Sequence, residues 1–345
     1  MDSITQAALG ASVGGLVLGK RYGCRALLWG AVLGTLPDLD VLIRYANAVA
    51  NYTNHRGFSH SLFILSLLSL LLAPLIDRWK KPECGALRLW LFIWLCLITH
   101  PLLDLFTAYG TQIFWPLPVG PLSLSAISII DPLFTLPLLL AVGCFVVIKK
   151  SRPRALPIGL GIACCYLAAT VIFKQIVEHK ARTAFANKAP IESLFSTPTL
   201  FNSLLWHLVI RTPDSICVAD SSWLNRIPLR HLKCWPTLDQ TGLPVLPQLE
   251  RLRWFSHDLL RLEITDNKLI ATDLRLGGLG FYPFRFVLAQ EDSQGQWHGI
   301  TSIRHPLAPD TRPALVGLVM KQLSALRQPY LIAPAKAETS DTPGQ

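Results

Sequence analysis

The chain has 345 residues, of which 51% are hydrophobic and 16% are charged, and its net charge is +10. Soluble domains average roughly 25% charged residues, so this composition argues against a protein that is soluble throughout. The basic residues gather at the ends of apolar runs, which is typical of the cytoplasmic loops of membrane proteins. We therefore expect no nucleic-acid partner, because that role needs the positive charge on one continuous surface.

Six apolar runs in the first half predict a membrane α-helical bundle of about six spans. The runs are residues 7–19, 25–36, 62–76, 87–106, 127–148 and 156–173. Residues 87–106 match the length of about 20 residues that a membrane helix needs, whereas the first two runs are short. We expect these two to be tilted, re-entrant or shielded by the longer helices. Glycines four residues apart, such as Gly10 and Gly14, predict close helix packing.

The second half of the chain predicts a soluble α+β, strand-rich C-terminal domain. The expected strands are residues 204–212, 215–222, 259–265, 269–274 and 284–290, with hairpin turns at 266–267 and 293–295. Residues 314–326 have helical apolar spacing, and residues 335–345 have the composition of a disordered tail. The predicted domains are thus a membrane-embedded domain (1–175), a soluble domain (176–334) and the tail.

Charge and cysteine content bear on how the chain lies in the membrane. Placing the basic residues of 20–25, 78–88 and 149–154 in the cytoplasm puts the other helix ends and the C-terminal domain on the periplasmic side. The opposite orientation would turn the whole arrangement toward the cytoplasm. Cys217 and Cys234 would form a disulfide on the periplasmic side, and two free thiols are an equally good interpretation.

Acidic and histidine side chains end several apolar runs, all on the face that this orientation makes periplasmic. They are Asp2, Asp38, Asp40, His55, His60, His100, Asp104 and Asp131. Ionisable groups near membrane depth are costly unless they are paired or bind a metal, and imidazole and carboxylate are metal ligands. His100 and Asp104 are four residues apart, so one helix face would present both. The alternative to a metal site for His100 and Asp104 is an ordinary hydrogen bond that stabilises the helix end. The alternative for Asp38 and Asp40 is a solvated turn.

Three further side chains accompany the histidine pair. Arg56 would either bind a phosphate or carboxylate through two hydrogen bonds or lie among the lipid headgroups. Ser59 and Ser61 precede an apolar run, and helix capping fits them better than a nucleophilic role because the chain has no Gly-x-Ser-x-Gly motif around them. The remaining histidines lack ligand spacing, and we interpret them as core or surface residues: His179, His207, His231, His257, His298 and His305.

Four ordered motifs resemble those of the YdjM-like family of inner-membrane-associated, metal-dependent hydrolases. They are residues 1–6 (MDSITQ), 34–40 (GTLPDLD), 55–61 (HRGFSHS) and 99–111 (THPLLDLFTAYGT). The resemblance implies a multi-pass protein of the bacterial inner membrane with a hydrolase activity that is itself inferred for the family. The motifs more distantly resemble the metal-binding segments of zinc-dependent phospholipases C.

These observations lead to the hypothesis of a metal-dependent hydrolase. Asp38, Asp40, His55, His60, His100 and Asp104 would bind one or two divalent ions, with Asp2 or Asp131 as further ligands and zinc or manganese as the metal. Asp40, His60 and Arg56 would take part in catalysis, with Arg56 neutralising charge on the reacting group. A site at headgroup height suggests a membrane lipid or lipid-linked phosphoester as substrate. The alternative is a non-enzymatic membrane anchor, in which a structural metal or polar cluster presents a binding domain.

Overall fold

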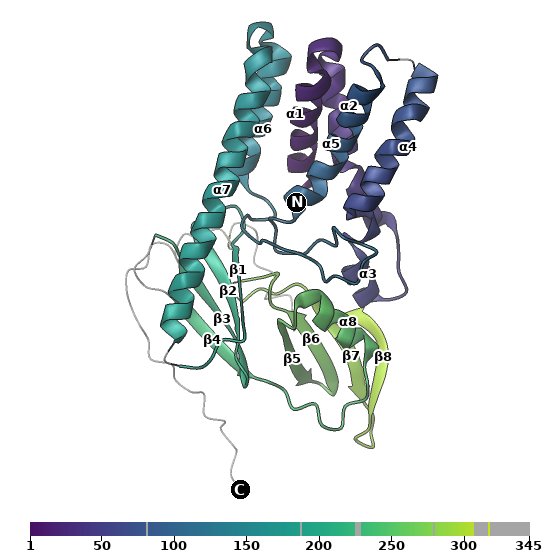
Figure 1. Cartoon of the computed structure of the whole chain (residues 1–345). Coiled ribbons are helices and arrows are strands. Elements are labelled where there is room, and N and C mark those ends of the chain that lie inside the picture. The colour runs from purple at the N-terminus through teal and green to yellow at the C-terminus, as the bar shows by residue number, and fades with distance from the viewer. Residues whose placement is uncertain (81, 187, 225–228, 279, 307–316, 318–345) are drawn as a thin grey trace.

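A helical bundle forms one end of the molecule and two β-sheets form the other (Figure 1). The computed structural model describes residues 1–80, 82–186, 188–224, 229–278, 280–306 and 317. The bundle helices are α1 (Ser3–Tyr22), α2 (Cys24–Thr35), α4 (Leu62–Lys80), α5 (Ala86–Asp104), α6 (Pro132–Val147) and α7 (Arg152–Phe185). Between them lie the short helices η1 (Leu36–Leu42), α3 (Ala48–Asn54), η2 (Phe58–His60) and η3 (Lys149–Ser151).

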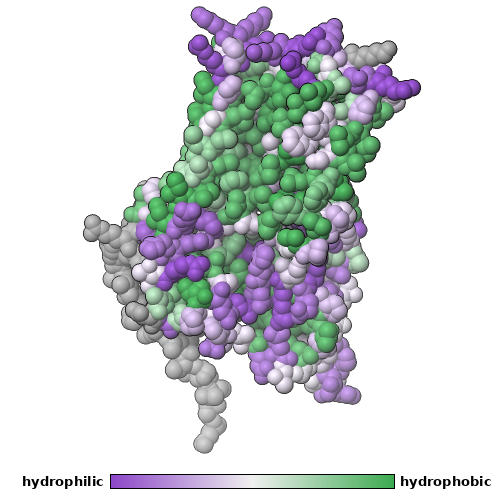
Figure 2. All heavy atoms as spheres, in the orientation of Figure 1, coloured by the Kyte–Doolittle hydropathy of each residue, from purple (hydrophilic) through white to green (hydrophobic). Residues whose placement is uncertain are grey.

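Three segments among the described residues are long and apolar enough to cross a membrane: Leu62–Lys80, Ala86–Asp104 and Lys149–Phe185. Helix α6 is a shorter apolar helix. A membrane region is therefore supported, whereas the count of about six spans stays a prediction. Figure 2 shows the bundle as a hydrophobic belt between hydrophilic residues at its far end and over the sheets.

Helices α1 and α2 pack with almost no side chain between them. A Cβ added at Gly14 would lie 2.8 Å from the Ala26 carbonyl oxygen, and one at Gly10 would overlap the Gly30 carbonyl oxygen. Such spacing is closer than Cβ atoms allow, so only glycine permits this approach. The predicted close packing is confirmed. Only α2, with 12 residues, is short; α1 has 20 residues and is as long as α4 and α5, so the expectation that both helices are short is wrong for α1.

The C-terminal domain contains two four-stranded antiparallel sheets, each with its strands in chain order. The first sheet has β1 (Ser193–Pro198), β2 (Leu205–Arg211), β3 (Ser215–Ser222) and β4 (Arg230–Pro236). The second has β5 (Leu260–Thr265), β6 (Lys268–Asp273), β7 (Arg285–Glu291) and β8 (Trp297–Arg304), and α8 (Pro247–Ser256) precedes it. All five predicted strands are present, but the sequence did not predict β1, β4, β8 or α8. The helix expected at 314–326, apart from residue 317, and the tail at 335–345 lie outside the described residues.

Two local predictions in this domain are resolved. Asp266 and Asn267 both have positive φ, 51° and 56°, as the predicted hairpin turn between β5 and β6 requires. Cys217 and Cys234 lie opposite each other on β3 and β4 and form a disulfide, so the interpretation as two free thiols is wrong.

Helix α7 joins the two ends of the molecule without a break. Its 34 residues correspond to about 51 Å, longer than a membrane is thick. Beyond the bundle, Val177 and Ala181 pack against Trp206 and Leu208 of β2. The span expected at 156–173 and the charged segment that follows it are therefore one continuous helix.

The second sheet and α8 also contact the segment that follows η1. Val49 and Tyr52 of α3 share a hydrophobic core with Leu252 and Phe255 of α8. The Tyr52 hydroxyl donates a hydrogen bond of 2.9 Å to Asp273. The C-terminal domain thus supports the polar segment that carries His55 and His60.

Candidate metal centre

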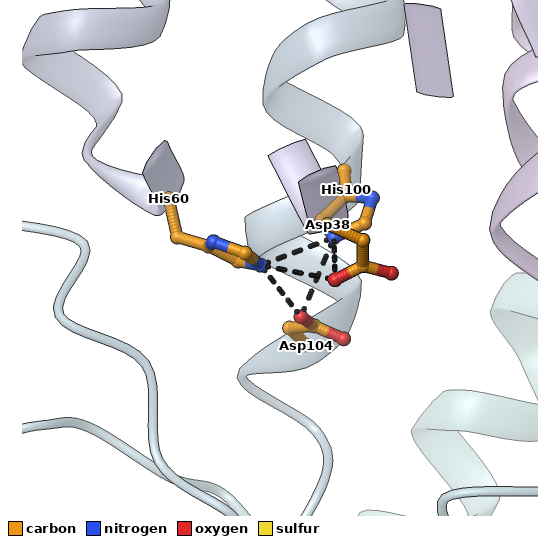
Figure 3. Close-up of side chains that lie close together, drawn as sticks. All are labelled: Asp38, His60, His100 and Asp104. Carbon is orange, nitrogen blue, oxygen red and sulfur yellow. Dashed lines mark hydrogen bonds and ion pairs between the residues drawn. The ribbon is translucent and has the colours of Figure 1, made fainter. Parts of the chain in front are cut away.

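Four predicted ligands come together where the bundle meets the C-terminal domain (Figure 3). Asp38 comes from η1, His60 from η2, and His100 and Asp104 from α5. One ligand atom from each residue lies within 4.8 Å of the other three. We call these four residues the His2Asp2 cluster.

The local sequence explains how each side chain reaches the cluster. Pro37 lies in the first turn of η1, directly after α2, and η1 turns Asp38 back toward α5. His60 ends η2, directly before Ser61 and the first residue of α4. His100 and Asp104 project from one face of α5, although Pro101 lies between them.

Five of the six distances between the donor atoms match those around a tetrahedral ion. His60 Nε2 lies 3.2 Å from both His100 Nε2 and Asp104 Oδ2, and 3.5 Å from Asp38 Oδ1. His100 Nε2 lies 3.3 Å from Asp38 Oδ1 and 3.5 Å from Asp104 Oδ2. Ligands about 2.0–2.1 Å from a tetrahedral zinc ion are about 3.3–3.4 Å from each other. These five distances suit one such ion, and the ligand atoms of Asp38 and Asp104 lie within 4.8 Å of each other.

Neighbouring groups fix both imidazoles in the form that binds a metal. His100 Nδ1 lies 2.6 Å from the carbonyl oxygen of Gly34, which can only accept, so Nδ1 carries the proton. Ser59 donates its hydroxyl hydrogen to Asp40, and its oxygen, 2.9 Å from His60 Nδ1, can accept from that nitrogen. Both rings then direct an unprotonated Nε2 into the cluster.

Asp104 is fully buried, and several donors surround it. Its Oδ1 accepts from the Gln6 side chain at 3.1 Å and from the amino group of Met1. Its Oδ2 lies 3.2 Å from Arg56 Nε, yet it has no hydrogen-bond partner among the described residues. A buried carboxylate oxygen without such a partner is costly, and a bound cation would satisfy it. The residues present therefore fit a metal ion.

Asp38 is the member of the cluster that reaches the surface. Its side chain is 22% exposed, while those of His60, His100 and Asp104 are buried. The cluster therefore opens on the side of Asp38.

Asp40 and His55 were expected among the ligands, and the structure places them beside the cluster. Asp40 Oδ1 lies 2.9 Å from His55 Nδ1. Asp40 Oδ2 accepts hydrogen bonds from the Arg56 amide and the Ser59 hydroxyl, and it lies 3.8 Å from His60 Nδ1. Asp40 therefore holds the loop and, through Ser59, the orientation of His60.

Arg56 fits neither interpretation made from the sequence. Its side chain is buried and donates a 2.9 Å hydrogen bond to Thr107, and its guanidinium lies over the Tyr109 ring. With Nε 3.2 Å from Asp104 Oδ2, this charge lies against a member of the cluster rather than among lipid headgroups. Arg56 also has a φ of 60°, a conformation that is uncommon for residues other than glycine.

The other predicted residues have local roles. Asp2 is the N-cap of α1 and accepts from Thr5, and Asp131 is the N-cap of α6 and accepts from the Tyr166 hydroxyl. Neither belongs to the His2Asp2 cluster. Ser61 donates to the Trp115 carbonyl oxygen and lies 3.4 Å from the Ile64 amide, so a capping role at the start of α4 is supported.

The sequence did not predict the groups that orient the ligands. The Gly34 carbonyl, Gln6 and Thr107 all lie within the recognised motifs. Only their place in those motifs could have marked them, because a backbone carbonyl or an amide carries no ligand signature of its own.

Comparisons with known proteins agree with a membrane assignment. A family profile described as YdjM inner membrane protein matches residues 1–177, which include the whole His2Asp2 cluster. The chain is 26% identical to YfhP of Bacillus subtilis over 244 residues, covering 66% of this chain and 73% of YfhP. It is 37% identical to the inner membrane protein YbcI of Escherichia coli over 116 residues, covering 33% of this chain and 66% of YbcI. No solved structure matches.

Proposed function

This chain belongs to the YdjM inner membrane protein family, and on that premise we propose that it is a membrane-bound, metal-dependent hydrolase. The observation that carries the proposal is the His2Asp2 cluster, whose four donor atoms lie within 4.8 Å of one another and whose imidazoles both present Nε2. When bound, a divalent ion lowers the pKa of a coordinated water and polarises the bond to be cleaved. Zinc suits two imidazoles and two carboxylates best, with manganese as the second choice.

The surrounding residues divide into those that hold the ion and those that position them. Asp38, His60, His100 and Asp104 would hold it, with Asp38 facing the open side. Arg56 would stabilise the charge of Asp104 rather than contact a substrate oxygen, which revises the catalytic role expected from the sequence. Asp40 would act on catalysis only indirectly. It accepts the Ser59 hydrogen, so that the Ser59 oxygen accepts from His60 Nδ1 and fixes the proton there.

The proposed substrate is a membrane lipid or a lipid-linked phosphoester. Support comes from the position of the cluster at the end of α5, a helix apolar enough to span a membrane. A phosphoester of a lipid headgroup lies at this height, whereas a soluble metabolite would need no such placement.

We further propose about six spans, with the cluster and the C-terminal domain on the periplasmic side. The loops between α1 and α2, α4 and α5, and α6 and α7 lie at the end of the bundle away from the sheets (Figure 1). These loops carry the basic residues, which favours a cytoplasmic location for that end. The disulfide between Cys217 and Cys234 supports an oxidising compartment for the C-terminal domain. The division at residue 175 into membrane and soluble domains is part of this proposal.

A second function is favoured by one observation: four protein groups surround the site and three of them are buried. A tetrahedral site closed by four protein ligands is typical of a structural metal. The chain would then be a membrane anchor that presents its C-terminal domain. X-ray absorption of the zinc-loaded protein separates the two, because a water ligand supports catalysis and its absence supports a structural site.

The first test is metal analysis of the detergent-purified full chain beside His60→Ala and Asp104→Ala. We expect about one equivalent of zinc or manganese in the wild type and its loss in both variants. His298→Ala is the matched control, because His298 is exposed and pairs only with Asp292 at the surface. Equal metal content in all four proteins, or none in the zinc-incubated wild type, would refute the metal centre. Metal bound without turnover of any phosphoester would leave the structural role.

A further inference from the structure

The segment that carries Asp38 has an apolar outer side. Leu39, Val41, Leu42 and Ile43 are all exposed, and the exposed fractions of Val41 and Leu42 are 70% and 75%. Asp38 and Asp40 in the same short helix contact the cluster and its loop instead. We call residues 39–43 the rim, because they border the open side of the cluster.

The surroundings of the rim indicate what covers it. It follows α2 directly, and α2 exposes Leu28, Trp29 and Val32 on its own surface. The neighbouring η2 carries Phe58, which is exposed and contacts the exposed Trp115. Aromatic side chains of this kind are enriched where a membrane meets water. The apolar surface of the bundle thus continues without interruption to the rim.

The residue after the rim is positively charged. Arg44 is exposed and follows Ile43 directly. An arginine beside an inserted apolar segment lies at the height of lipid phosphates and can bind one of their oxygens. Asp38 of the cluster is therefore followed by the rim, whose apolar side chains point outward, and then by the positively charged Arg44. Asp40, within the rim, points inward.

We propose that the rim inserts into the adjoining membrane leaflet and that a glycerophospholipid reaches Asp38 laterally across it. The acyl chains would lie against Leu39 and Leu42, and the phosphate would lie beside Arg44 on the open side of the cluster. Insertion follows from the exposed apolar surface alone. Binding of the lipid at the cluster rests on the proposed function, and it specifies the substrate class as glycerophospholipid.

Photo-cross-linking of the full chain in nanodiscs of phosphatidylethanolamine and phosphatidylglycerol tests the insertion. A benzophenone amino acid is placed at position 42, at position 71 on the exposed face of α4, or at position 245 in the C-terminal domain. Val245 is the matched water-facing control, since it is 90% exposed. We expect phospholipid adducts at position 42 in a yield near that at position 71. A yield as low as that at position 245 would overturn the insertion.

A second experiment tests the route with Val41→Asp and Leu42→Asp combined, and Val245→Asp as its control. We expect the double variant to keep its metal and its turnover of a soluble phosphodiester, and to lose more than about tenfold in turnover of vesicle phospholipid. Equal turnover of vesicle phospholipid by the double variant and the control would overturn the route. If the wild type cleaves neither substrate, the proposed function fails, and the cross-linking result still decides the insertion.

Discussion

The bundle and the C-terminal domain differ in what they expose rather than in what they bury. Both bury apolar side chains, such as Leu97 and Leu208, and both bury charged ones, such as Asp104 and Asp273. The bundle also leaves large apolar side chains on its surface, and Trp29 of α2 is 60% exposed. Water drives apolar side chains inward, whereas lipid is as apolar as leucine and leaves packing and polar contacts to hold helices together. A charge buried in the bundle is surrounded first by protein and then by lipid, so the free-energy cost of removing it from water is high. Such a charge therefore needs an oppositely charged or hydrogen-bonding partner.

The largest expected effect contrasts two tryptophans. Trp206→Ala should reduce the stability of the first sheet by about 3–5 kcal/mol, because it leaves a cavity in a buried core. Trp29→Ala removes an exposed side chain from α2 and should change stability little. Hydrogen exchange measures both, at the β2 and β3 amides for Trp206→Ala and at the α2 amides for Trp29→Ala. An equal loss in the two variants would mean that Trp29 packs against protein rather than lipid.

The next effect tests the close approach of α1 and α2. Gly10→Ala should destabilise the bundle by about 1–3 kcal/mol, because the new methyl group would overlap the Gly30 carbonyl oxygen. Gly143→Ala is the control, since nothing described lies within 4 Å of its added Cβ. A thermal melt in detergent reports the unfolding through a thiol-reactive dye that reaches the buried Cys96, once the exposed Cys24, Cys164 and Cys165 have been replaced by serine in both variants. Equal melting of the two variants would contradict the packing described.

A smaller effect concerns the orientation of one ligand. Ser59→Ala removes the acceptor for His60 Nδ1 and should weaken zinc binding about 10–100-fold, as loss of an outer-shell partner does. Ser61→Ala removes the neighbouring hydroxyl, which bonds the Trp115 carbonyl oxygen, and should leave zinc affinity unchanged. Competition with a chromogenic chelator measures both affinities. A weaker site in Ser61→Ala than in Ser59→Ala would exclude this role for Ser59.

The smallest effect lies in the C-terminal domain and depends on pH. Burial opposes ionisation of Asp220, but the nearby imidazole of His207 and the hydrogen bond with His231 outweigh it and lower the pKa of Asp220. The hydrogen bond to Asp220 raises the pKa of the half-exposed His231. The ionised pair is therefore most stabilising between the ordinary values of 3.8 and 6.5, and its contribution is lost below the lowered pKa of Asp220 and above the raised pKa of His231.

His231→Ala should thus lower stability by less than about 1 kcal/mol, most near about pH 5–6 and least above about pH 8. Urea unfolding across this range measures the change, with the exposed His179→Ala as control. A pH-independent loss would assign the effect of His231 to packing.

The sequence predicted which residues lie together better than it predicted their separate roles. Motif order and helical spacing pointed to Asp38, His60, His100 and Asp104, which the structure brings within 4.8 Å of one another, while metal binding by these residues stays a prediction. The same reasoning added Asp40 and His55, because a carboxylate that holds a ligand has the same composition as one that binds metal. Only the fold separates them: η1 turns Asp38 to the cluster and leaves Asp40 with Ser59.

The missed strands have a related cause. The edge strands β1, β4 and β8 pair on one side only and mix polar and apolar residues irregularly. The fourth edge strand, β5, was predicted because Leu260, Leu262 and Ile264 alternate with polar residues. In β4, for example, Lys233 is exposed beside the half-buried Leu232, and Pro236 ends the strand. Central strands such as β2 are apolar and buried nearly throughout, and those were predicted.

Helix α7 also limits how the length of this chain can change. Each residue inserted into an α-helix turns everything beyond it by about 100° and moves it by about 1.5 Å. Val177 packs on the first sheet, and the second sheet packs on α3. One extra residue between the bundle and Val177 would therefore rotate the first sheet out of its position beside the second sheet. Length variation among relatives should therefore fall in the loops. The number of residues in α7 should stay constant, because it sets the rotation and the distance between the bundle and the first sheet.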